Sequence, residues 1–332
     1  MAHDLAIDLG TARSRVATRS DGVVIDQPTV VALDGRTKSV IGMGSPAEAL
    51  IGSTTKPVRT AWPLVQGAVA DYDTAVRLLR YLFRAAGGSR FGRPKVLLGV
   101  PGTATPIERR ALGKAAAEAG ASQVRLLEQP IAAAIELGLP LDQPTGSMVC
   151  DFGAGKTEVA VLSMGGVVAS RGLRIGGLDL DDAIATYIRM TSGVVLSRSV
   201  ATSVKEQLVT MSPMGSDQAV ELSGRAVTTG DPATVVVTAS ELRPALDDLV
   251  RQLVSTVVQC LGEAPPEVAQ DIIFHGIHVV GGGSQLHGLA HRLEEATDVP
   301  VHLHEEPSIV MVSGLRRCLA LGSRYDELFS RV

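Results

Sequence analysis

The chain carries one short pattern twice, near its beginning and near its middle. Each copy opens with an Asp at the end of an apolar stretch, passes through a Gly-containing turn and enters a second apolar stretch. Six residues of the first copy recur in the second copy, each 143 positions later. Asp8, Gly10, Val16, Ala17, Ser20 and Gly22 match, in this order, Asp151, Gly153, Val159, Ala160, Ser163 and Gly165. Because the spacing holds across a whole strand–turn–strand segment, we interpret it as the trace of a duplicated domain.

The length of the chain agrees with two such domains, because 332 residues are many for one compact core. After each copy, strand patterns alternate with helix patterns. They predict a strand over 95–100, helices over 74–86 (with Asp73 as N-cap), 105–119, 131–137 and 239–261, and a strand over 277–280. We therefore expect an α/β fold of two duplicated domains, whose mixed, largely parallel sheets are flanked by helices.

The expected domain boundaries lie where the alternation of strand and helix patterns is interrupted. Domain I covers 1–145, with a small excursion at about 33–62, and domain II covers 146–311, with a small excursion at about 182–238. Residues 312–332 are expected to return to domain I. The segment Pro144-Thr-Gly146, directly before the second copy, is the expected crossing between the halves.

Composition excludes some classes of function. The formal net charge is −4 with mixed signs and no basic stripe, so nucleic-acid binding is not expected. Cys150, Cys260 and Cys318 lack metal-ligand spacing and are expected to be small buried side chains in a reducing cytosol. The start lacks a signal peptide pattern, which predicts a cytoplasmic protein. The pairs His287/His291 and His302/His304 are expected to be surface histidines.

The repeated turns are suited to hold a nucleotide triphosphate. Each turn offers backbone N–H groups, made accessible by Gly, that can bind phosphate oxygens. Asp8 and Asp151 each end an apolar strand, where a carboxylate needs a cation or a polar network. Two such carboxylates can hold waters of a hydrated Mg²⁺. The pattern therefore predicts a phosphate and Mg²⁺ site in a cleft between the two halves.

These residues also resemble a known family. Asp8-Leu-Gly-Thr11 and Asp151-Phe-Gly-Ala-Gly155 resemble the two phosphate loops of the actin, heat-shock chaperone and sugar kinase superfamily, and Val279-Val-Gly-Gly-Gly-Ser284 resembles its adenosine motif. Within that superfamily the chain is most similar to the MreB/Mbl bacterial actins, through segments that run in order along it: Gln27-Pro-Thr-Val-Val-Ala32, Gly67-Ala-Val-Ala-Asp71, Leu127-Glu-Gln-Pro-Ile-Ala-Ala-Ala-Ile135 and Pro265-Pro-Glu-Val-Ala-Gln-Asp-Ile272.

The resemblance implies a role for each matching position. The first loop would meet the β- and γ-phosphates, the second would hold phosphate from the other side, and Asp8 and Asp151 would serve the metal, mainly through water. The Gly176-Gly177 turn would lie near the phosphates, and Lys205-Glu206 would meet ribose and base. The implied nucleotide-binding residues are Asp8, Gly10, Thr11, Ala12, Arg13, Gly153, Ala154, Gly155, Gly176, Gly177, Lys205, Glu206, Gly281, Gly282, Gly283 and Ser284.

Several positions depart from the family pattern. The usual Glu-Glu-Pro is Glu128-Gln129-Pro130, so the residue that would position the attacking water is an amide, which orients water but is a poor base. The Thr that usually follows the second loop is Lys156, and Ala154 and Arg13 replace Gly and Asn. With Gln129, Asp151 and Lys156 as the catalytic candidates, ATP and Mg²⁺ binding is expected, together with slow hydrolysis coupled to polymerisation.

The resemblance implies filaments of this chain that guide cell-wall synthesis and cell shape. Partners would be further copies and cell-wall synthesis or morphogenesis proteins at the membrane, with weak membrane contact near Phe91 on the cytoplasmic face. Three alternatives stay open: a nucleotide-binding scaffold with little or no hydrolysis, a chaperone-like ATPase switch, and a small-molecule kinase of the same superfamily. The sequence shows neither a peptide-binding domain for the second nor a sugar pocket for the third.

Overall fold

The structure is a computed structural model that describes residues 4–51, 57–87, 93–208, 217, 219–321 and 330–331. It divides into two compact units. Unit 1 comprises the described residues of Met1–Thr145, Leu162–Val167 and Ser308–Val332, and unit 2 comprises those of Gly146–Val161 and Val168–Pro307. The chain therefore first passes from unit 1 to unit 2 between Thr145 and Gly146, within the segment Pro144-Thr-Gly146.

Unit 1 is built on a six-stranded sheet in the order β19-β10-β9-β1-β2-β3. Its central strands β1, β9 and β10 run parallel, whereas β1–β2, β2–β3 and β10–β19 are antiparallel pairs. The first copy of the repeated pattern forms the antiparallel part. The strands are β1 (Asp4–Leu9), β2 (Arg13–Thr18), β3 (Gly22–Pro28), β9 (Lys95–Val100), β10 (Gln123–Glu128) and β19 (Ser330–Arg331).

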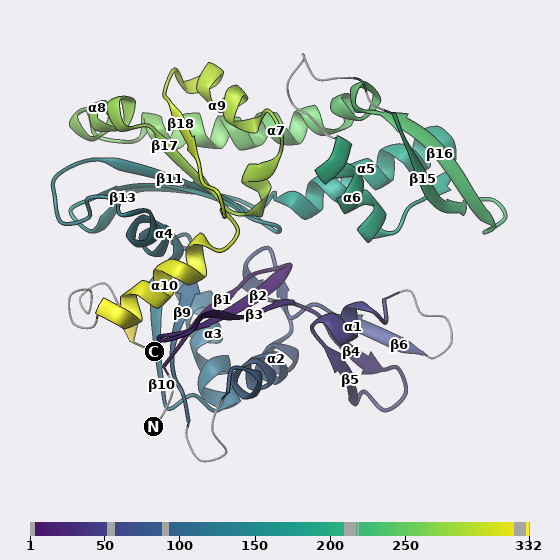
Figure 1. Ribbon diagram of the computed structural model, residues 1–332, viewed down its shortest axis with the longest axis horizontal. Helices are drawn as coiled ribbons and strands as arrows, with labels where there is room; N and C mark the ends of the chain where they lie inside the picture. Colours follow the sequence, from purple (N-terminus) through teal and green to yellow (C-terminus); the bar gives the residue numbers. More distant parts are fainter. Residues whose placement is uncertain are drawn as a thin grey trace. The chain divides into compact units, whose positions relative to one another are not determined.

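Helices cover both faces of this sheet (Figure 1). One face carries α2 (Tyr72–Ala85) and α3 (Pro106–Ala119), and the other carries α4 (Gln129–Leu137) and α10 (Val310–Leu321). Cover on both faces explains why β1 and β9 read as nearly unbroken apolar runs. A side chain at Gly314 would overlap the carbonyl of Ala132, so α10 and α4 can cross this closely only because Gly lacks one.

The start of α2 differs from the expectation. The Asp71 carboxylate accepts a hydrogen bond from the backbone N–H of Thr74 at 3.0 Å, and Asp71 itself is extended, as an N-cap residue should be. Asp73, the expected cap, is the second residue of the helix. The prediction of Asp73 was therefore wrong by two residues, because either acidic residue suits the first turn of a helix.

A small three-stranded sheet, ordered β5-β4-β6, extends unit 1 between β3 and α2. It carries its own small core of Val30, Ala32 and Ala47. The hairpin of β7 and β8 follows it. The elements are β4 (Val31–Asp34), β5 (Val40–Met43), α1 (Ser45–Glu48), β6 (Val58–Ala61), β7 (Leu64–Val65) and β8 (Ala68–Val69).

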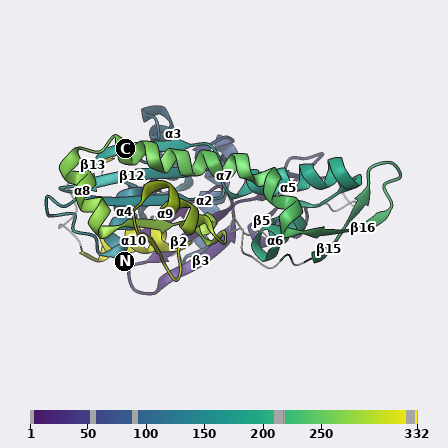
Figure 2. The ribbon, with the colours of Figure 1, turned by 90° about the horizontal axis from the view of Figure 1, so that it is seen from above.

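Unit 2 is built on a five-stranded sheet in the order β13-β12-β11-β17-β18, in which β11, β17 and β18 run parallel. Figure 2 shows the long helix α7 running along this unit. Its buried residues, from Leu242 to Cys260, recur every three or four positions and face the core. The elements are β11 (Ser147–Phe152), β12 (Thr157–Ser163), β13 (Gly166–Leu173), α5 (Gly177–Ser192), α7 (Ala239–Gly262), α8 (Pro266–His275), β17 (Ile277–Val280), the 3₁₀ helix η1 (Gly282–Gln285), α9 (Leu289–Thr297) and β18 (Val301–Leu303).

A second small sheet, ordered β14-β15-β16, lies between α5 and α7 in the chain. Helix α6 packs on α5 and on β15. The elements are β14 (Val194–Val195), α6 (Arg198–Leu208), β15 (Ala219–Ala226) and β16 (Pro232–Thr238).

Most of the elements expected from the sequence are confirmed. The strands 95–100 and 277–280 are β9 and β17, and the helix 239–261 ends one residue later, at Gly262. The helix 105–119 begins at Pro106 because Thr105 is its N-cap, and the helix 131–137 begins two residues earlier, at Gln129. The three cysteines are buried, as expected.

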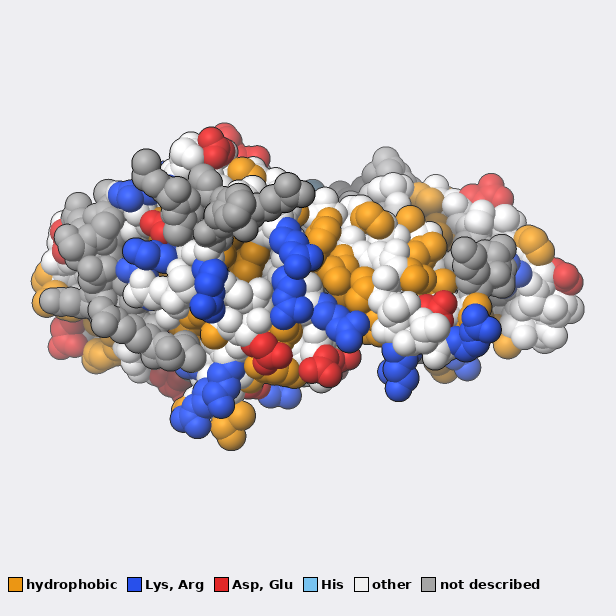
Figure 3. Space-filling model, turned by 90° about the horizontal axis from the view of Figure 1, so that it is seen from below, with side chains coloured by type: hydrophobic (Ala, Val, Ile, Leu, Met, Phe, Trp, Pro, Cys, Tyr) orange, Lys and Arg blue, Asp and Glu red, His pale blue; other side chains and the backbone are white. Residues whose placement is uncertain are grey.

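The surface gives two further findings. Figure 3 shows hydrophobic, basic and acidic side chains next to one another on one face. No helix within the described ranges is long and apolar enough to cross a membrane. Phe91, the expected point of membrane contact, lies outside the described residues.

Candidate functional site

The two copies of the repeated pattern form the same backbone turn. The N–H of Gly10 donates to the carbonyl of Arg13 at 3.0 Å, and the N–H of Gly153 donates to the carbonyl of Lys156 at 3.0 Å. A Cβ at Gly10 or Gly153 would lie 2.7 or 2.9 Å from the same carbonyl oxygen, so each turn needs Gly at this position. The sequence repeat is therefore also a repeat of backbone geometry, at matching positions.

In unit 1 the carboxylate before the turn is buried. Asp8 is 6% exposed, and burial raises the pKa of its carboxyl, while the charge of Arg15 and a hydrogen bond from Gln129 act in the opposite direction. Gln129 Nε2 donates to Asp8 Oδ1 at 3.1 Å. The fold thus joins the first Asp and the catalytic candidate Gln129, residues far apart in the sequence, because α4 begins directly after β10.

The rest of the first loop is held by neighbouring backbone and by β3. Thr11 Oγ1 accepts a hydrogen bond from the N–H of Gly67 at 3.1 Å, and the carbonyl of Ala12 accepts one from Thr29 at 2.8 Å. The Arg13 guanidinium donates to the carboxylate of Asp26 at 2.5 Å. Arg13 therefore contributes its backbone to the turn, whereas its side chain is bonded to β3.

Glu128, next to Gln129, has a separate partner. Arg109 donates to Glu128 Oε1 at 2.7 Å and to the carbonyl of Gly102 at 2.8 Å. This clamp fixes the end of β10, from which Gln129 extends toward Asp8. Sequence reasoning missed Arg109, because nothing in the local pattern of α3 links it to a residue on the next strand.

In unit 2 the second Asp lies against the Gly-rich loop after β17. Parallel pairing places Asp151 opposite Val280, so the ends of β11 and β17 are adjacent. Gly281 has φ +82°, and a side chain there would overlap Asp151 Oδ1, whereas a Cβ at Gly282 would meet nothing within 4 Å. Ser284, 2% exposed, donates to the carbonyl of Gly281 at 2.7 Å. The structure thus brings Asp151 and the expected adenosine loop together.

The start of α5 holds the second loop, the one expected to bind phosphate. The N–H of Gly177 donates to the carbonyl of Gly153 at 3.0 Å, and that of Leu178 donates to the carbonyl of Ala154 at 2.8 Å. A Cβ at Gly176 would lie 2.5 Å from the Ala154 oxygen. Gly176 and Gly177 therefore lie beside the second loop, and their close approach positions it.

Lys156 and Lys205 both form ion pairs inside unit 2. Lys156 Nζ lies 3.0 Å from Oε2 of Glu158, a residue that is only 1% exposed. Lys205 Nζ lies 2.8 Å from Asp181 Oδ1 and donates to the carbonyl of Gly177 at 2.8 Å. Both ammonium groups thus neutralise buried carboxylates close to the second loop. Glu206 is exposed on α6.

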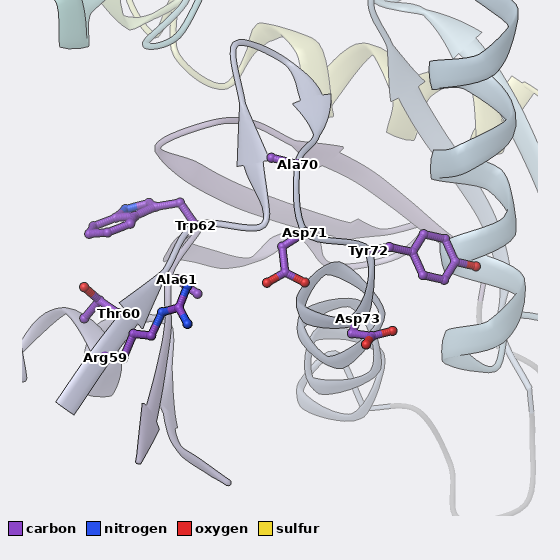
Figure 4. Close-up of a pocket in the computed structure, with 8 residues that line it drawn as sticks. All are labelled: Arg59, Thr60, Ala61, Trp62, Ala70, Asp71, Tyr72 and Asp73. Carbon is purple, nitrogen blue, oxygen red and sulfur yellow. The ribbon is translucent and has the colours of Figure 1, made fainter. Parts of the chain in front are cut away.

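A hollow of about 600 Å³ in unit 1 is separate from these residues (Figure 4). It lies between β6 and the start of α2, and none of the expected site residues lines it. The Asp71 carboxylate in it caps α2, and the Tyr72 hydroxyl donates to Glu118 at 3.0 Å. Two of its polar side chains, Asp71 and Tyr72, thus have structural partners, and the candidate residues remain the loop around Asp8 in unit 1 and the loops around Asp151 in unit 2.

Known proteins share this architecture over the whole chain. The structure of MreB5 of Spiroplasma citri bound to ADP matches with a TM-score of 0.89 at 28% identity, covering 98% of this chain and 97% of that one. The MamK double helical filament matches with a TM-score of 0.81 at 21% identity, covering 96% and 99%. The fold is therefore actin-like, an α/β fold with mixed sheets flanked by helices.

Sequence comparison defines the family within that fold. The cell shape-determining protein MreB of Escherichia coli (strain K12) is 36% identical over 336 aligned positions, covering 99% of this chain and 97% of that protein. The cell shape-determining protein Mbl of Bacillus subtilis (strain 168) is 33% identical over 323, covering 97% and 95%. The MreB/Mbl protein family model matches residues 2–326, and the chain belongs to this family.

Proposed function

We propose that this chain binds ATP with Mg²⁺ and assembles with further copies of itself into filaments that take part in determining bacterial cell shape. The observation that carries the proposal is the pair of identical turns at Gly10 and Gly153, each of which follows an Asp and is closed by a 3.0 Å hydrogen bond. The family membership, the MreB5 structures with ADP and AMPPNP and the names of the MreB and Mbl relatives support it.

The residues fit the two ligands. Backbone N–H groups at Gly-rich turns suit phosphate oxygens, and the backbone at Gly282 is open, since a Cβ there would meet nothing within 4 Å. A carboxylate as buried as Asp8 gains from a nearby cation, and oxygen donors are the ligands that Mg²⁺ prefers. In this proposal Asp8 and Asp151 hold the metal mainly through water, and the first and second loops, Gly176-Gly177, Lys205-Glu206 and Gly281–Ser284 bind the nucleotide.

Hydrolysis is proposed to be slow. Gln129 is oriented by its hydrogen bond to Asp8, so its amide can orient water, but it cannot accept the proton as a carboxylate would. Lys156 is engaged with Glu158, and release of that pair would be needed before its ammonium could stabilise the charge of a γ-phosphate. A scaffold that binds nucleotide with little or no turnover is the second candidate, favoured by the same two residues.

The place of action and the partners are part of the proposal. We expect the filaments in the cytoplasm, on the cytoplasmic face of the membrane, together with cell-wall synthesis or morphogenesis proteins. We also propose the division of the chain into domain I (1–145 with 312–332) and domain II (146–311), with excursions at about 33–62 and 182–238.

The test of the site is Asp151→Ala. Because the carboxylate serves the metal, the variant should bind Mg·ATP at least tenfold more weakly and adenosine almost unchanged, as measured by calorimetric titration of each ligand. Asp248→Ala, which removes an exposed carboxylate from α7, is the matched control and should bind both ligands normally. An equal loss of affinity for both ligands in Asp151→Ala would contradict the metal role.

A further inference from the structure

The first turn of helix α5 contacts both the second loop and helix α6, which packs on α5 (Figure 1). The N–H of Gly177 donates to the carbonyl of Gly153 in the second loop at 3.0 Å. The carbonyl of the same Gly177 accepts a hydrogen bond from Lys205 Nζ of α6 at 2.8 Å. A Cβ at Gly177 would lie 3.2 Å from that nitrogen, so the ammonium lies close against the backbone of the turn. One residue of α5 therefore links the second loop to α6.

Asp181 is the residue that holds this ammonium. It lies one helical turn after Gly177 and is only 1% exposed. Its Oδ1 lies 2.8 Å from Lys205 Nζ, and it has no hydrogen-bond partner among the described residues, so the ion pair is what compensates its burial. Its Oδ2 accepts a hydrogen bond from the hydroxyl of Thr202 at 2.7 Å. Both oxygens of one buried carboxylate on α5 are thus held by α6.

A second ion pair between the same two helices is of a different kind. Arg198 of α6 lies 3.5 Å from Asp182 of α5, and their side chains are 49% and 65% exposed. An exposed pair of this kind contributes little to stability. The pair of Asp181 with Lys205 is buried, so loss of either partner would leave an unpaired charge inside the protein. The buried pair is therefore the polar contact that fixes α6 on the first turn of α5.

The hydrogen bonds from α5 also set the direction in which the second loop offers its N–H groups. The carbonyl of Gly153 accepts from Gly177 at 3.0 Å. The carbonyl of Ala154 accepts from the N–H of Leu178 at 2.8 Å. In these trans peptides the C=O and the N–H point in opposite directions. The N–H groups of Ala154 and Gly155 therefore point away from α5, where backbone donors of a loop can bind an anion.

We propose that Asp181 is a positioning residue of the nucleotide site: it holds Lys205 on the first turn of α5, and this bridge keeps the second loop in the conformation that binds phosphate. The inference rests on the proposed function and deepens it, because it assigns the influence of Lys205 to the phosphate part of the ligand, through Gly177. Asp181 acts without touching the nucleotide, since both of its oxygens are engaged with α6.

The experiment measures hydrogen exchange of individual backbone amides in the full chain without nucleotide, by mass spectrometry. Asp181→Asn removes the charge that holds the ammonium and keeps the shape of the side chain. The amides of Gly177 and Leu178, which donate to the second loop, should then exchange at least about tenfold faster, while those of strand β17 keep their rates. Asp182→Asn is the matched control, because it removes an exposed carboxylate from the next position of α5, and it should exchange like the parent.

A double variant separates positioning from stability. Asp181→Asn leaves Lys205 unpaired and can destabilise the protein for that reason alone. Adding Lys205→Met removes both charges, so the bridge is absent but no unpaired charge is buried. The double variant should unfold at a temperature close to that of the parent, yet its Gly177 and Leu178 amides should exchange as fast as in Asp181→Asn. A merely structural role would restore the exchange rates of the parent together with its stability.

Calorimetric titration of the same proteins assigns the effect to one part of the ligand. Asp181→Asn and the double variant should bind Mg·ATP about tenfold more weakly, because the loop that meets phosphate is no longer held in place. Both should bind adenosine almost as the parent does. Asp182→Asn should bind both ligands normally.

Two results would overturn the proposal. One is exchange at Gly177 and Leu178 that stays at the rate of the parent in both Asp181 variants. The other is an equal loss of affinity for adenosine and Mg·ATP, because the influence of Lys205 would then fall on the nucleoside. A parent that binds no Mg·ATP would contradict the proposed function itself, whereas the exchange rates decide the bridge without any nucleotide.

Discussion

Replacing Gln129 by Glu tests whether the buried contact with Asp8 controls the electrostatics of unit 1. A carboxylate at this position would place a second negative charge about 3 Å from Asp8, where the amide nitrogen now donates at 3.1 Å. Both residues are nearly inaccessible, at 6% and 9% exposure, so solvent screens the pair little. With an effective dielectric constant of about 20, the repulsion is about 5 kcal/mol.

The folded variant should avoid this repulsion by keeping one proton on the pair. In the unfolded chain a Glu ionises near pH 4.3, so above that pH the folded variant binds one proton more than the unfolded chain. The free energy of unfolding, relative to the parent, must then fall by about 1.4 kcal/mol per pH unit as pH rises. The loss should be about 2 kcal/mol at pH 6 and about 5 kcal/mol at pH 8, and it should vanish below about pH 4.

The assay is urea unfolding followed by tryptophan fluorescence at a series of pH values. Trp62 is the single tryptophan of the chain and lies in unit 1, so it reports the unit that contains the substitution. Gln129→Met is the control: it removes the hydrogen bond without adding charge and should cost about 1 kcal/mol with little dependence on pH. A loss in Gln129→Glu that is equal at pH 5 and pH 8 would refute the reasoning.

Two further substitutions have outcomes that the structure fixes. Lys156→Thr removes the ammonium that pairs with buried Glu158 and should lower the free energy of unfolding by about 3 kcal/mol. The double variant Lys156→Thr with Glu158→Gln should recover most of this loss. A double variant as unstable as Lys156→Thr alone would mean that the ion pair does not contribute to stability. Asp71→Ala should cost about 1 kcal/mol through loss of the N-cap of α2, whereas Asp73→Ala should cost much less, and the reverse order in thermal unfolding would contradict the assigned cap.

The parts of the site that the sequence predicted are those set by local chemistry. Asp8 and Asp151 became candidates because a carboxylate at the end of an apolar strand is unusual, and the two turns were predicted because Gly recurs at the matching positions 10 and 153. The same local character explains the correct strands β9 and β17. Local chemistry could not choose between Asp71 and Asp73, since both suit the first turn of a helix.

The contacts that the sequence did not predict depend on which elements become neighbours in space. Arg109 reaches Glu128 because α3 packs beside β10, and Lys205 reaches Asp181 because α6 packs on α5. The contact of Gln129 with Asp8 likewise needs the order of strands β10, β9 and β1. Hydrophobic periodicity predicts α3 and α4, but it does not identify the polar partner that each helix meets, and α6 lies in a segment for which the sequence predicted no regular pattern.

Nucleotide-driven assembly is tested most directly by sedimentation of the parent protein at micromolar concentration, with phosphate release measured in the same samples. With Mg²⁺ and ATP the chain should pellet, and far less than one phosphate per chain should be released while assembly proceeds. With EDTA in place of Mg²⁺ it should stay in the supernatant. Protein that stays in the supernatant with Mg²⁺ and ATP, with and without lipid vesicles, or that pellets equally without nucleotide, would contradict the proposed function.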